Sequence, residues 1–130
     1  MTVSLGMATI LVPSYDAGIT FFVDVLGFSL IEDTQLSPSK RWVVIGAGSG
    51  DFRLLLAEPT SDQQLAALGR QSGDRVFLFL HSDDFAADHQ RLMDHGIEFL
   101  EQPRQEAYGQ VAVFRDPFGN KWDLIQRRAP

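Results

Sequence analysis

The segment GQVAVFRDPFGNKWDLIQ, Gly109 to Gln126, decides the fold because it has the pattern of two strands joined by a tight turn. Its first part, Val111 to Phe114, is an apolar run of strand length that is rich in β-branched and aromatic residues. The next five residues, Asp116 to Asn120, have the chemistry of a turn, in which Pro117 presets φ and the glycine tolerates positive φ. The segment therefore predicts a β-hairpin.

The second strand of this hairpin has two different faces. Side chains alternate across a strand, so Trp122 and Leu124 share one face while Lys121, Asp123 and Ile125 share the other. The first face is apolar and is expected to join the core. The second face carries an acid and a base beside an apolar residue, which is typical of a pocket wall or a solvated face.

Composition limits the classes of protein to which the chain can belong. Its 130 residues suit one domain, which at this length buries about two-thirds of its unfolded surface. No cysteine is present, so disulfides, thiolate metal sites and a cysteine nucleophile are excluded. The net charge of -6 argues against a nucleic-acid partner and mildly favours neutral or cationic ligands. We find no apolar run of about 18 residues and no export signal, so we expect a cytoplasmic protein without a membrane partner.

The rest of the chain repeats one order of elements: a strand, a helix ended by glycine, and three more strands. In the first half we expect strands at Leu5–Val12, Phe28–Thr34, Arg41–Ile45 and Phe52–Ala57, a helix from Ser14 or Asp16 to Leu26, and turns at Ser37–Lys40 and Ala47–Gly50. In the second half we expect strands at Val76–Leu80 and Ile97–Leu100, a helix from Asp83 or Asp84 to His95, a loop at Pro103–Ala107, and the closing hairpin.

This duplication predicts one domain over residues 1–130, with module one at about 1–58, a connector at about 59–75 that holds a short amphipathic piece at Asp62–Leu68, and module two at about 76–130. Each half has an open edge and an unburied face, and two halves together complete a curved sheet. The expected fold class is α+β, with tandem βαβββ modules forming a curved, cup-like mixed sheet with helices on the outside.

Three motifs carry a family resemblance: F-F-x-x-x-L-G-F at Phe21–Phe28, L-x-x-x-G-I-x-F at Leu92–Phe99 and D-P-F-G-N-x-W-D-L at Asp116–Leu124. With their order along the chain, they resemble the vicinal oxygen chelate superfamily of glyoxalase I, extradiol dioxygenases, fosfomycin-modifying enzymes and bleomycin-resistance proteins. The segments R-W-V-V at Arg41 and Y-G-x-V-A-V-F-R-D at Tyr108 resemble a bacterial branch of it. The resemblance implies a homodimer.

Metal-dependent members of this superfamily hold one divalent ion with His or Glu side chains. The resemblance places their ligand positions at Met7, at Leu54 or Leu55, at Val76 or Phe77, and at Asp123. Only Asp123 has a side chain suited to such an ion, and three or more ligands are needed. We therefore expect no family-type metal centre and no cofactor.

Other candidate chemistry is weaker. We interpret His89 as a histidine at the margin of a helix, although a ligand or a base is the alternative, and neither His81 nor His95 belongs to an HExxH motif. The glycine-rich segment at 46–50 precedes a strand and is expected to be a hairpin turn and not a phosphate-binding loop.

A ligand pocket needs an aromatic platform, apolar walls and a few polar groups. The candidates for its lining are Met7, Thr9, Trp42, Arg53, Leu55, Tyr108, Val113, Lys121 and Asp123. In the alternative interpretation, Trp42 and Tyr108 are ordinary core or interface aromatics. A buried Asp123 needs a partner, and Lys121, Arg53 or a cationic ligand are the candidates.

Two functions remain open, and they belong to different classes. The first is a metal-independent binder of a small organic molecule, for example one that sequesters a planar or cationic antibiotic, with Trp42 or Tyr108 stacking on it and Asp123 supplying charge. The second is a glyoxalase-like lyase or isomerase, or a dioxygenase, with a non-standard metal site or none. A third option is a regulatory domain with no pocket. The sequence leaves open the ligand and the strand register.

Overall fold

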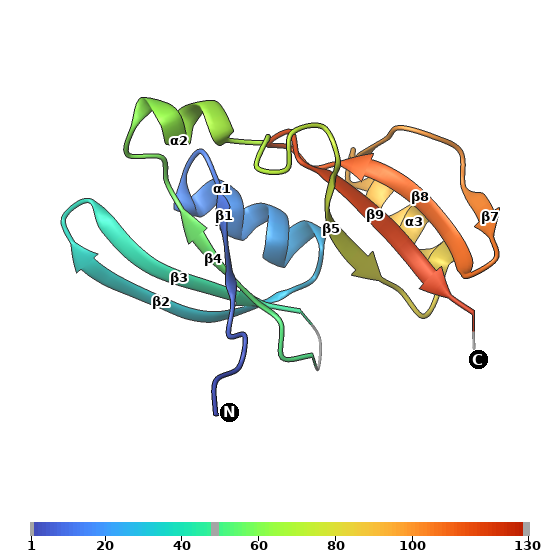
Figure 1. The fold of residues 1–130 in the computed structure, drawn as a ribbon, viewed down its shortest axis with the longest axis horizontal. Helices are drawn as coiled ribbons and strands as arrows, with labels where there is room; N and C mark the ends of the chain where they lie inside the picture. The colour runs from blue at the N-terminus through green and yellow to red at the C-terminus, as the bar shows by residue number, and fades with distance from the viewer. Residues whose placement is uncertain (1, 48–49, 129–130) are drawn as a thin grey trace. The chain divides into compact units, whose positions relative to one another are not determined.

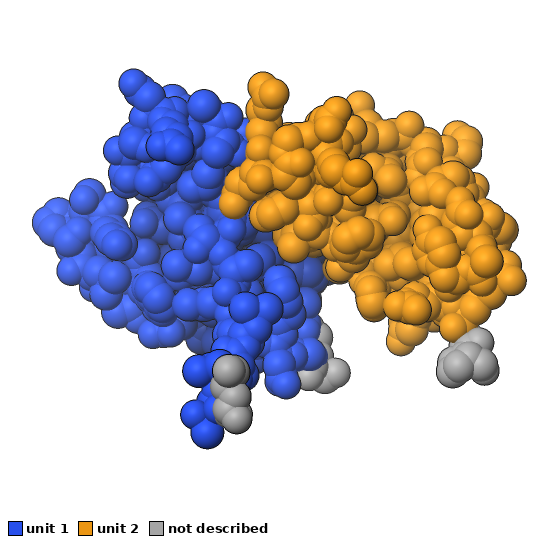
Figure 2. Space-filling model, viewed as in Figure 1, with its two compact units in different colours: residues 1–68 blue, residues 69–130 orange. Residues whose placement is uncertain are grey.

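The computed structural model describes residues 2–47 and 50–128. Its internal contacts divide the chain into two compact units, Met1–Leu68 and Gly69–Pro130, which Figure 2 shows in blue and orange. Each unit combines helices with a mixed sheet, so the predicted α+β class is confirmed. Among the described residues, no helix has the length and apolar character needed to cross a membrane.

Unit 1 is a four-stranded sheet with one helical segment packed on it (Figure 1). Its elements are β1 (Ala8–Leu11), α1 (Tyr15–Ile19), the π-helix η1 (Thr20–Val25), β2 (Ser29–Ser37), β3 (Lys40–Gly46), β4 (Arg53–Ala57) and α2 (Asp62–Ala67). The strand order is β1-β4-β3-β2, in which β1 is parallel to β4 and the other neighbours are antiparallel.

The first helical segment differs from the regular α-helix that the sequence predicts. Ser14 caps its start by accepting a hydrogen bond from the Ala17 N–H at 3.1 Å, but from Thr20 onward the segment is a π-helix. A π-helix turns less per residue than an α-helix, and the adjacent Phe21 and Phe22 are both buried in this one. Gly27 follows with φ of 80°, which confirms the predicted glycine at the end of the helix.

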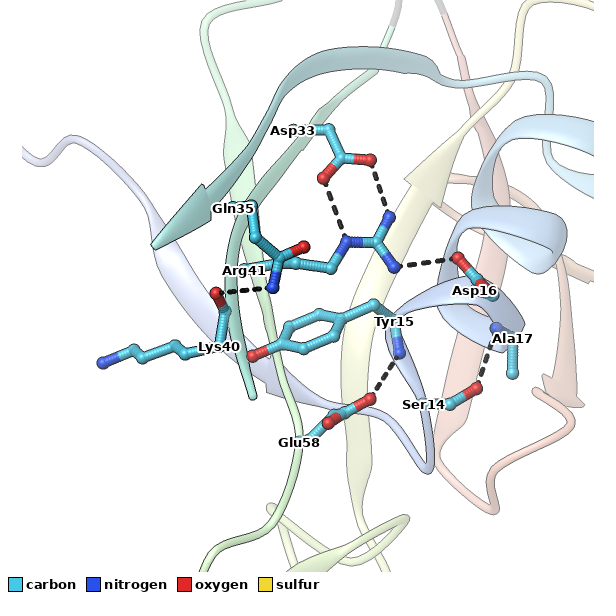
Figure 3. Close-up of polar contacts among 9 residues, drawn as sticks. All are labelled: Ser14, Tyr15, Asp16, Ala17, Asp33, Gln35, Lys40, Arg41 and Glu58. Atoms are coloured by element: carbon cyan, nitrogen blue, oxygen red, sulfur yellow. Dashed lines mark hydrogen bonds and ion pairs between the residues drawn. The ribbon is translucent and has the colours of Figure 1, made fainter. Parts of the chain in front are cut away.

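Arg41 connects the β2–β3 hairpin to the start of α1 (Figure 3). Its guanidinium lies 2.6 Å from Asp33 Oδ2 and 2.9 Å from Asp16 Oδ1, and it stands over the Tyr15 ring at 5.3 Å from the centroid. The hydrogen bonds from Arg41 hold the pKa of the Asp33 carboxyl below its usual range, although burial opposes this shift. We interpret this group as structural, because it lies on the face of the sheet that packs on α1.

Unit 2 repeats the strand order of unit 1. Its elements are β5 (Val76–His81), α3 (Phe85–Asp94), β6 (Glu98–Phe99), β7 (Arg104–Glu106), β8 (Gly109–Arg115) and β9 (Lys121–Arg127). The order is β5-β9-β8-β6, with β7 also paired to β8, and β5 is parallel to β9. The loop predicted at Pro103–Ala107 is wrong in part, because Arg104–Glu106 forms a strand along the edge of β8. The polar residues of β7 carry no apolar alternation that would indicate it.

One face of the unit 2 sheet packs on α3, which lies behind β8 and β9 in Figure 1. Phe114 and Trp122 stack at 5.8 Å on this face, and Phe99 extends the row of rings toward the helix. His89 of α3 meets this row, with its ring 4.2 Å from that of Phe99 and 5.6 Å from that of Phe85 on the same helix. His89 is thus packed as a ring within an aromatic cluster.

The hairpin turn is held by the carboxylate of Asp116, which is 3% exposed. Its Oδ1 accepts from the N–H groups of Phe118 at 2.9 Å and Asn120 at 3.0 Å. Its Oδ2 accepts from Asn120 Nδ2 at 3.2 Å and from Trp122 Nε1 at 2.9 Å. The hairpin and its apolar face, with Trp122 and Leu124 buried, are as the sequence predicts.

Between the two sheets along the chain, α2 forms where a short amphipathic piece is expected, but it has no buried residue, and Leu65 is 60% exposed. The turn predicted at Ala47–Gly50 includes Gly48 and Ser49, which lie outside the described residues.

Candidate functional site

The sheet of unit 1 has an open face, which is the face turned away from α1. Strand register places Thr9 of β1 beside Leu55 of β4, and Leu55 beside Val44 of β3. Leu54 and Leu56, which point the other way, are 3% and 1% exposed, whereas Leu55 is only half-buried. The open face therefore holds four predicted lining residues: Thr9, Trp42, Arg53 and Leu55. Met7 precedes β1, which begins at Ala8, and strand register does not place it.

Two of these side chains are already fixed by hydrogen bonds. The Trp42 indole N–H donates to Glu32 Oε2 at 3.1 Å, which orients its ring on the open face. Arg53 Nη1 donates to the carbonyls of Gly50 at 2.9 Å and Phe52 at 3.1 Å. A side chain at Gly46 would meet Arg53 at about 3.0 Å, so this glycine leaves room for the guanidinium. The face thus offers an aromatic ring and apolar surface with one cation at its edge.

The face of the unit 2 sheet that is turned away from α3, which we call its open face, is exposed at Phe79 but buried at Val111, Asp123 and Ile125. Val113, Lys121 and Asp123 share it, with Val113 and Asp123 directly opposite each other on β8 and β9. On the other side of Asp123, the parallel strand β5 places Phe79, which is 60% exposed. Tyr108 stands apart, because it lies in the β7–β8 loop, about 16 Å along the chain from the Val113–Asp123 pair at strand spacing.

Asp123 is the most unusual residue of this face. It is 7% exposed, and its Oδ1 is buried without a hydrogen-bond partner among the described residues. Of the predicted partners, Lys121 on the same strand donates to the Asp74 carbonyl at 2.9 Å, and Arg53 of unit 1 is held by the carbonyls described above. Burial raises the pKa of the Asp123 carboxyl, Arg104 partly offsets the rise, and Glu101 adds to it.

Two charged residues that the sequence did not indicate, Arg104 and Glu101, lie near enough to Asp123 to shift its pKa, and Glu106 is linked to them through Arg104. Arg104 Nε donates to Glu101 Oε1 at 2.8 Å, and Arg104 Nη1 bonds to Glu106. The other oxygen of Glu101 accepts from the Val113 N–H at 2.9 Å, so its side chain occupies the gap between β6 and β7 on the edge of β8. Burial raises the pKa of Glu101, but the hydrogen bonds from Arg104 and Val113 outweigh it and lower this pKa overall.

We call Glu101, Arg104, Glu106 and Asp123 the carboxylate cluster. The sequence indicates this cluster in one way only: Arg104 and Glu106 are two residues apart. In a strand this spacing puts both side chains on one face, but the sequence does not show that β7 is a strand. Phe79 was missed because Val76–Leu80 is a continuous apolar run, which does not show which of its residues are exposed.

A comparison of the whole chain with known families matches the Glyoxalase/Bleomycin resistance protein/Dioxygenase superfamily over residues 4–124. The chain belongs to this superfamily. A relative from Shewanella frigidimarina, described as an uncharacterized protein, is 46% identical over 128 residues, which cover 97% of this chain and 95% of the relative.

Solved structures of the superfamily fold are also similar to the chain. The crystal structure of UcmS2 matches with a TM-score of 0.80 and 28% identity over 96% of this chain and 98% of that one. TnmS3, an antibiotic binding protein from Streptomyces sp. CB03234, matches with a TM-score of 0.78 and 26% identity over 98% of this chain and 99% of that one.

The metal site of the metal-dependent superfamily members does not fit the residues present. Its positions hold the side chains of Met7, Leu54 or Leu55, and Val76 or Phe77, and only the last position, Asp123, offers an oxygen ligand. In residues 2–47 and 50–128, no group of three or more His, Cys, Asp or Glu side chains is placed to hold a metal ion. The side chains at these positions therefore differ from the usual ligands of the superfamily.

Proposed function

We propose that this superfamily member binds a small organic molecule without a metal ion. The observation that carries the proposal is the chemistry at the ligand positions, where one carboxylate stands among thioether and hydrocarbon side chains. A hard or borderline divalent ion requires several oxygen or nitrogen ligands, and these positions supply only one. An apolar surface with a few polar groups is instead what a small-molecule site requires.

The two open faces support this proposal separately. In unit 1, Trp42 and Leu55 provide an aromatic ring and apolar surface, with Thr9 as a hydroxyl group beside them. In unit 2, Val113 and the exposed ring of Phe79 flank the carboxylate of Asp123. Either face has the composition that holds an organic ligand by burial of apolar area and orients it by a few hydrogen bonds.

Sequestration of an antibiotic is the concrete version of this proposal. TnmS3 is an antibiotic binding protein, and its fold and length match this chain almost completely. Such a protein protects by holding its ligand, so it needs affinity but no reacting group. We propose that it acts in the cytoplasm as a homodimer, for which light scattering on the purified protein is the direct test.

A two-part experiment tests the proposal. Elemental mass spectrometry of untagged protein purified without chelator measures bound metal, and a thermal-shift screen of neutral and charged aromatic compounds measures ligand binding. We expect well below one equivalent of metal per chain and at least one compound that raises the melting temperature in a saturable way.

The variant Asp123→Ala separates binding from catalysis. If the protein is a binder, this variant weakens binding and no compound is turned over by either protein. If the protein is a lyase, isomerase or dioxygenase, the wild type converts aldehyde–thiol adducts or catechols, and Asp123→Ala abolishes the conversion. Turnover of this kind would contradict the proposal.

A further inference from the structure

We infer that the carboxylate cluster on the open face of unit 2 recognises an organic ammonium group carried on an aromatic or apolar body. This inference rests on the proposed function, because it names the class of small molecule that the protein binds. It adds the residues that select the ligand, among them Phe79, Glu101, Arg104 and Glu106.

The first argument is that the cations on this face of the sheet bond to groups other than Asp123. Glu101, Glu106 and Asp123 are three carboxyl groups, and Arg104 is the cation among them. Arg104 is engaged by both glutamates, so it offers Asp123 only an electrostatic interaction at longer range. Lys121 on the same strand is held by the carbonyl of Asp74. Arg115, on the same face of β8, donates to the carbonyl of Gly119 at 2.9 Å. A cation from outside the protein would therefore be the direct partner that Asp123 lacks among these residues.

The second argument is the buried oxygen without a partner. A carboxylate oxygen away from water costs free energy unless a donor reaches it, and Oδ1 of Asp123 lacks a donor among the described residues. The terminal torsion of an aspartate is broad, so rotation of the carboxylate can present either oxygen to a ligand. An ammonium N–H would supply a charge-assisted hydrogen bond, which is stronger than a bond between neutral groups.

The third argument is the apolar surface beside this carboxylate. Phe79 is paired with Asp123 in the register of β5 and β9, and 60% of it is exposed. Val113 flanks Asp123 on the other side. A ring next to an acid suits an aryl-alkyl ammonium, whose apolar part packs on Phe79 while its charge meets Asp123. The net charge of -6 attracts such cations to the protein.

The affinity for an ammonium ligand and the affinity for a neutral ligand would depend on pH in opposite ways. An ammonium needs an ionised Asp123, so its affinity falls as pH falls through the titration of this carboxyl, whereas a carbonyl ligand needs the protonated acid and binds more tightly there. The charged and titratable groups on the elements around Asp123 are Lys121 on β9, Arg115 on β8, His81 on β5, and Glu101, Arg104 and Glu106 on the other edge of β8. Because these groups can also change the pH dependence of the affinity, the test uses variants of Asp123 and Phe79.

The experiment uses two fluorescent probes that share one aromatic group: dansylcadaverine, which carries an ammonium, and dansyl butylamide, which is neutral. Binding is measured by fluorescence for the wild type, for Asp123→Asn and for Phe79→Ala. Asp24→Asn is the control for net charge, because Asp24 is exposed and lies in unit 1. Leu65→Ala is the control for Phe79→Ala, because both residues are 60% exposed.

We expect the ammonium probe to bind at least about 10-fold more tightly than the neutral probe, with Asp123→Asn removing this preference and Asp24→Asn retaining it. Phe79→Ala is expected to weaken binding of the ammonium probe several-fold and Leu65→Ala to leave it unchanged. Because Phe79 is exposed, its variant tests the site even if Asp123→Asn folds poorly.

Equal affinity for the two probes, or binding of the ammonium probe that Asp123→Asn does not weaken, would overturn the inference and leave the proposed function standing. Absence of binding by both probes would also overturn the assignment of this site. The proposed function itself fails only if the separate compound screen finds no ligand or finds turnover.

Discussion

Replacing Asp116 tests whether one buried carboxylate holds the closing hairpin. Asp116→Ala leaves four donors without their acceptor, and the three that come from Asn120 and Trp122 are in buried hydrogen bonds. An unsatisfied buried donor costs about 1–3 kcal/mol, so we expect a loss of roughly 3–6 kcal/mol after relaxation. This is a large part of the 5–15 kcal/mol of a typical domain, and Asp116→Ala is expected to be poorly folded.

Asp116→Asn is the measurable version of the same change. Its carbonyl oxygen can keep the two bonds to backbone N–H groups, but its NH₂ group then faces Asn120 Nδ2 and Trp122 Nε1, which are also donors. We expect a loss of roughly 2–4 kcal/mol in the free energy of unfolding. Urea unfolding followed by tryptophan fluorescence and circular dichroism measures it.

Asp24→Asn is the matched control, because it removes the same charge from an exposed site and should change stability by less than about 0.5 kcal/mol. If Asp116→Asn is as stable as this control, the turn is not held by its carboxylate, and our account of the hairpin is refuted.

Three further predictions concern a glycine and two aspartates. A Cβ atom at Gly69 would lie 1.9 Å from the Phe118 carbonyl oxygen, whereas a Cβ atom at Gly73, which has nearly the same positive φ, would meet nothing within 4 Å. We therefore expect Gly69→Ala to lower the free energy of unfolding, measured in urea, by about 1–3 kcal/mol more than Gly73→Ala does. Equal losses would contradict the close packing of Gly69. The pKa of Asp123 is raised in the folded protein, so the wild type loses stability as pH rises through this pKa. At neutral pH we therefore expect Asp123→Asn to melt at a higher temperature than the wild type. In acid, where Asp123 is protonated, we expect the two proteins to melt at the same temperature. The pKa of Asp33 is lowered, so Asp33→Asn should melt at a lower temperature at neutral pH, with a difference that disappears as pH falls through the folded pKa; the same sign of effect for both aspartates would refute one of these shifts.

The fold could be predicted from the sequence wherever local patterns and tertiary structure agree. Alternation along Lys121–Ile125 indicates which face is apolar, and the structure buries Trp122 and Leu124 on that face. The glycines at 27 and 96 mark the ends of both helical segments, since each adopts positive φ. The repeated order of elements in the sequence corresponds to the same strand order in both sheets.

Other features depend on contacts that no local pattern carries. The segment Thr20–Val25 is a π-helix in which the adjacent Phe21 and Phe22 are both buried, and a sequence period of 3.6 does not reveal this geometry. The strand β7 has no apolar alternation and forms because the edge of β8 is free to pair with it.

The candidate site could be predicted only in part for the same reason. Residues on the strands, such as Leu55 and Val113, follow from alternation alone. The carboxylate cluster requires β7 to lie in register with β8 and Glu101 to reach the Val113 N–H, and both are tertiary contacts. Exposure of Phe79 likewise depends on what covers β5, which its apolar sequence does not show.

The central claim is that the protein binds an organic ligand without a metal ion. The most direct test is a calorimetric titration of the strongest compound from the thermal-shift screen into protein that has been treated with EDTA. Our account predicts saturable binding with the same Kd in EDTA as in buffer that contains added divalent metal. Binding that disappears in EDTA and returns with one equivalent of Zn, Ni, Mn or Fe per chain would contradict it.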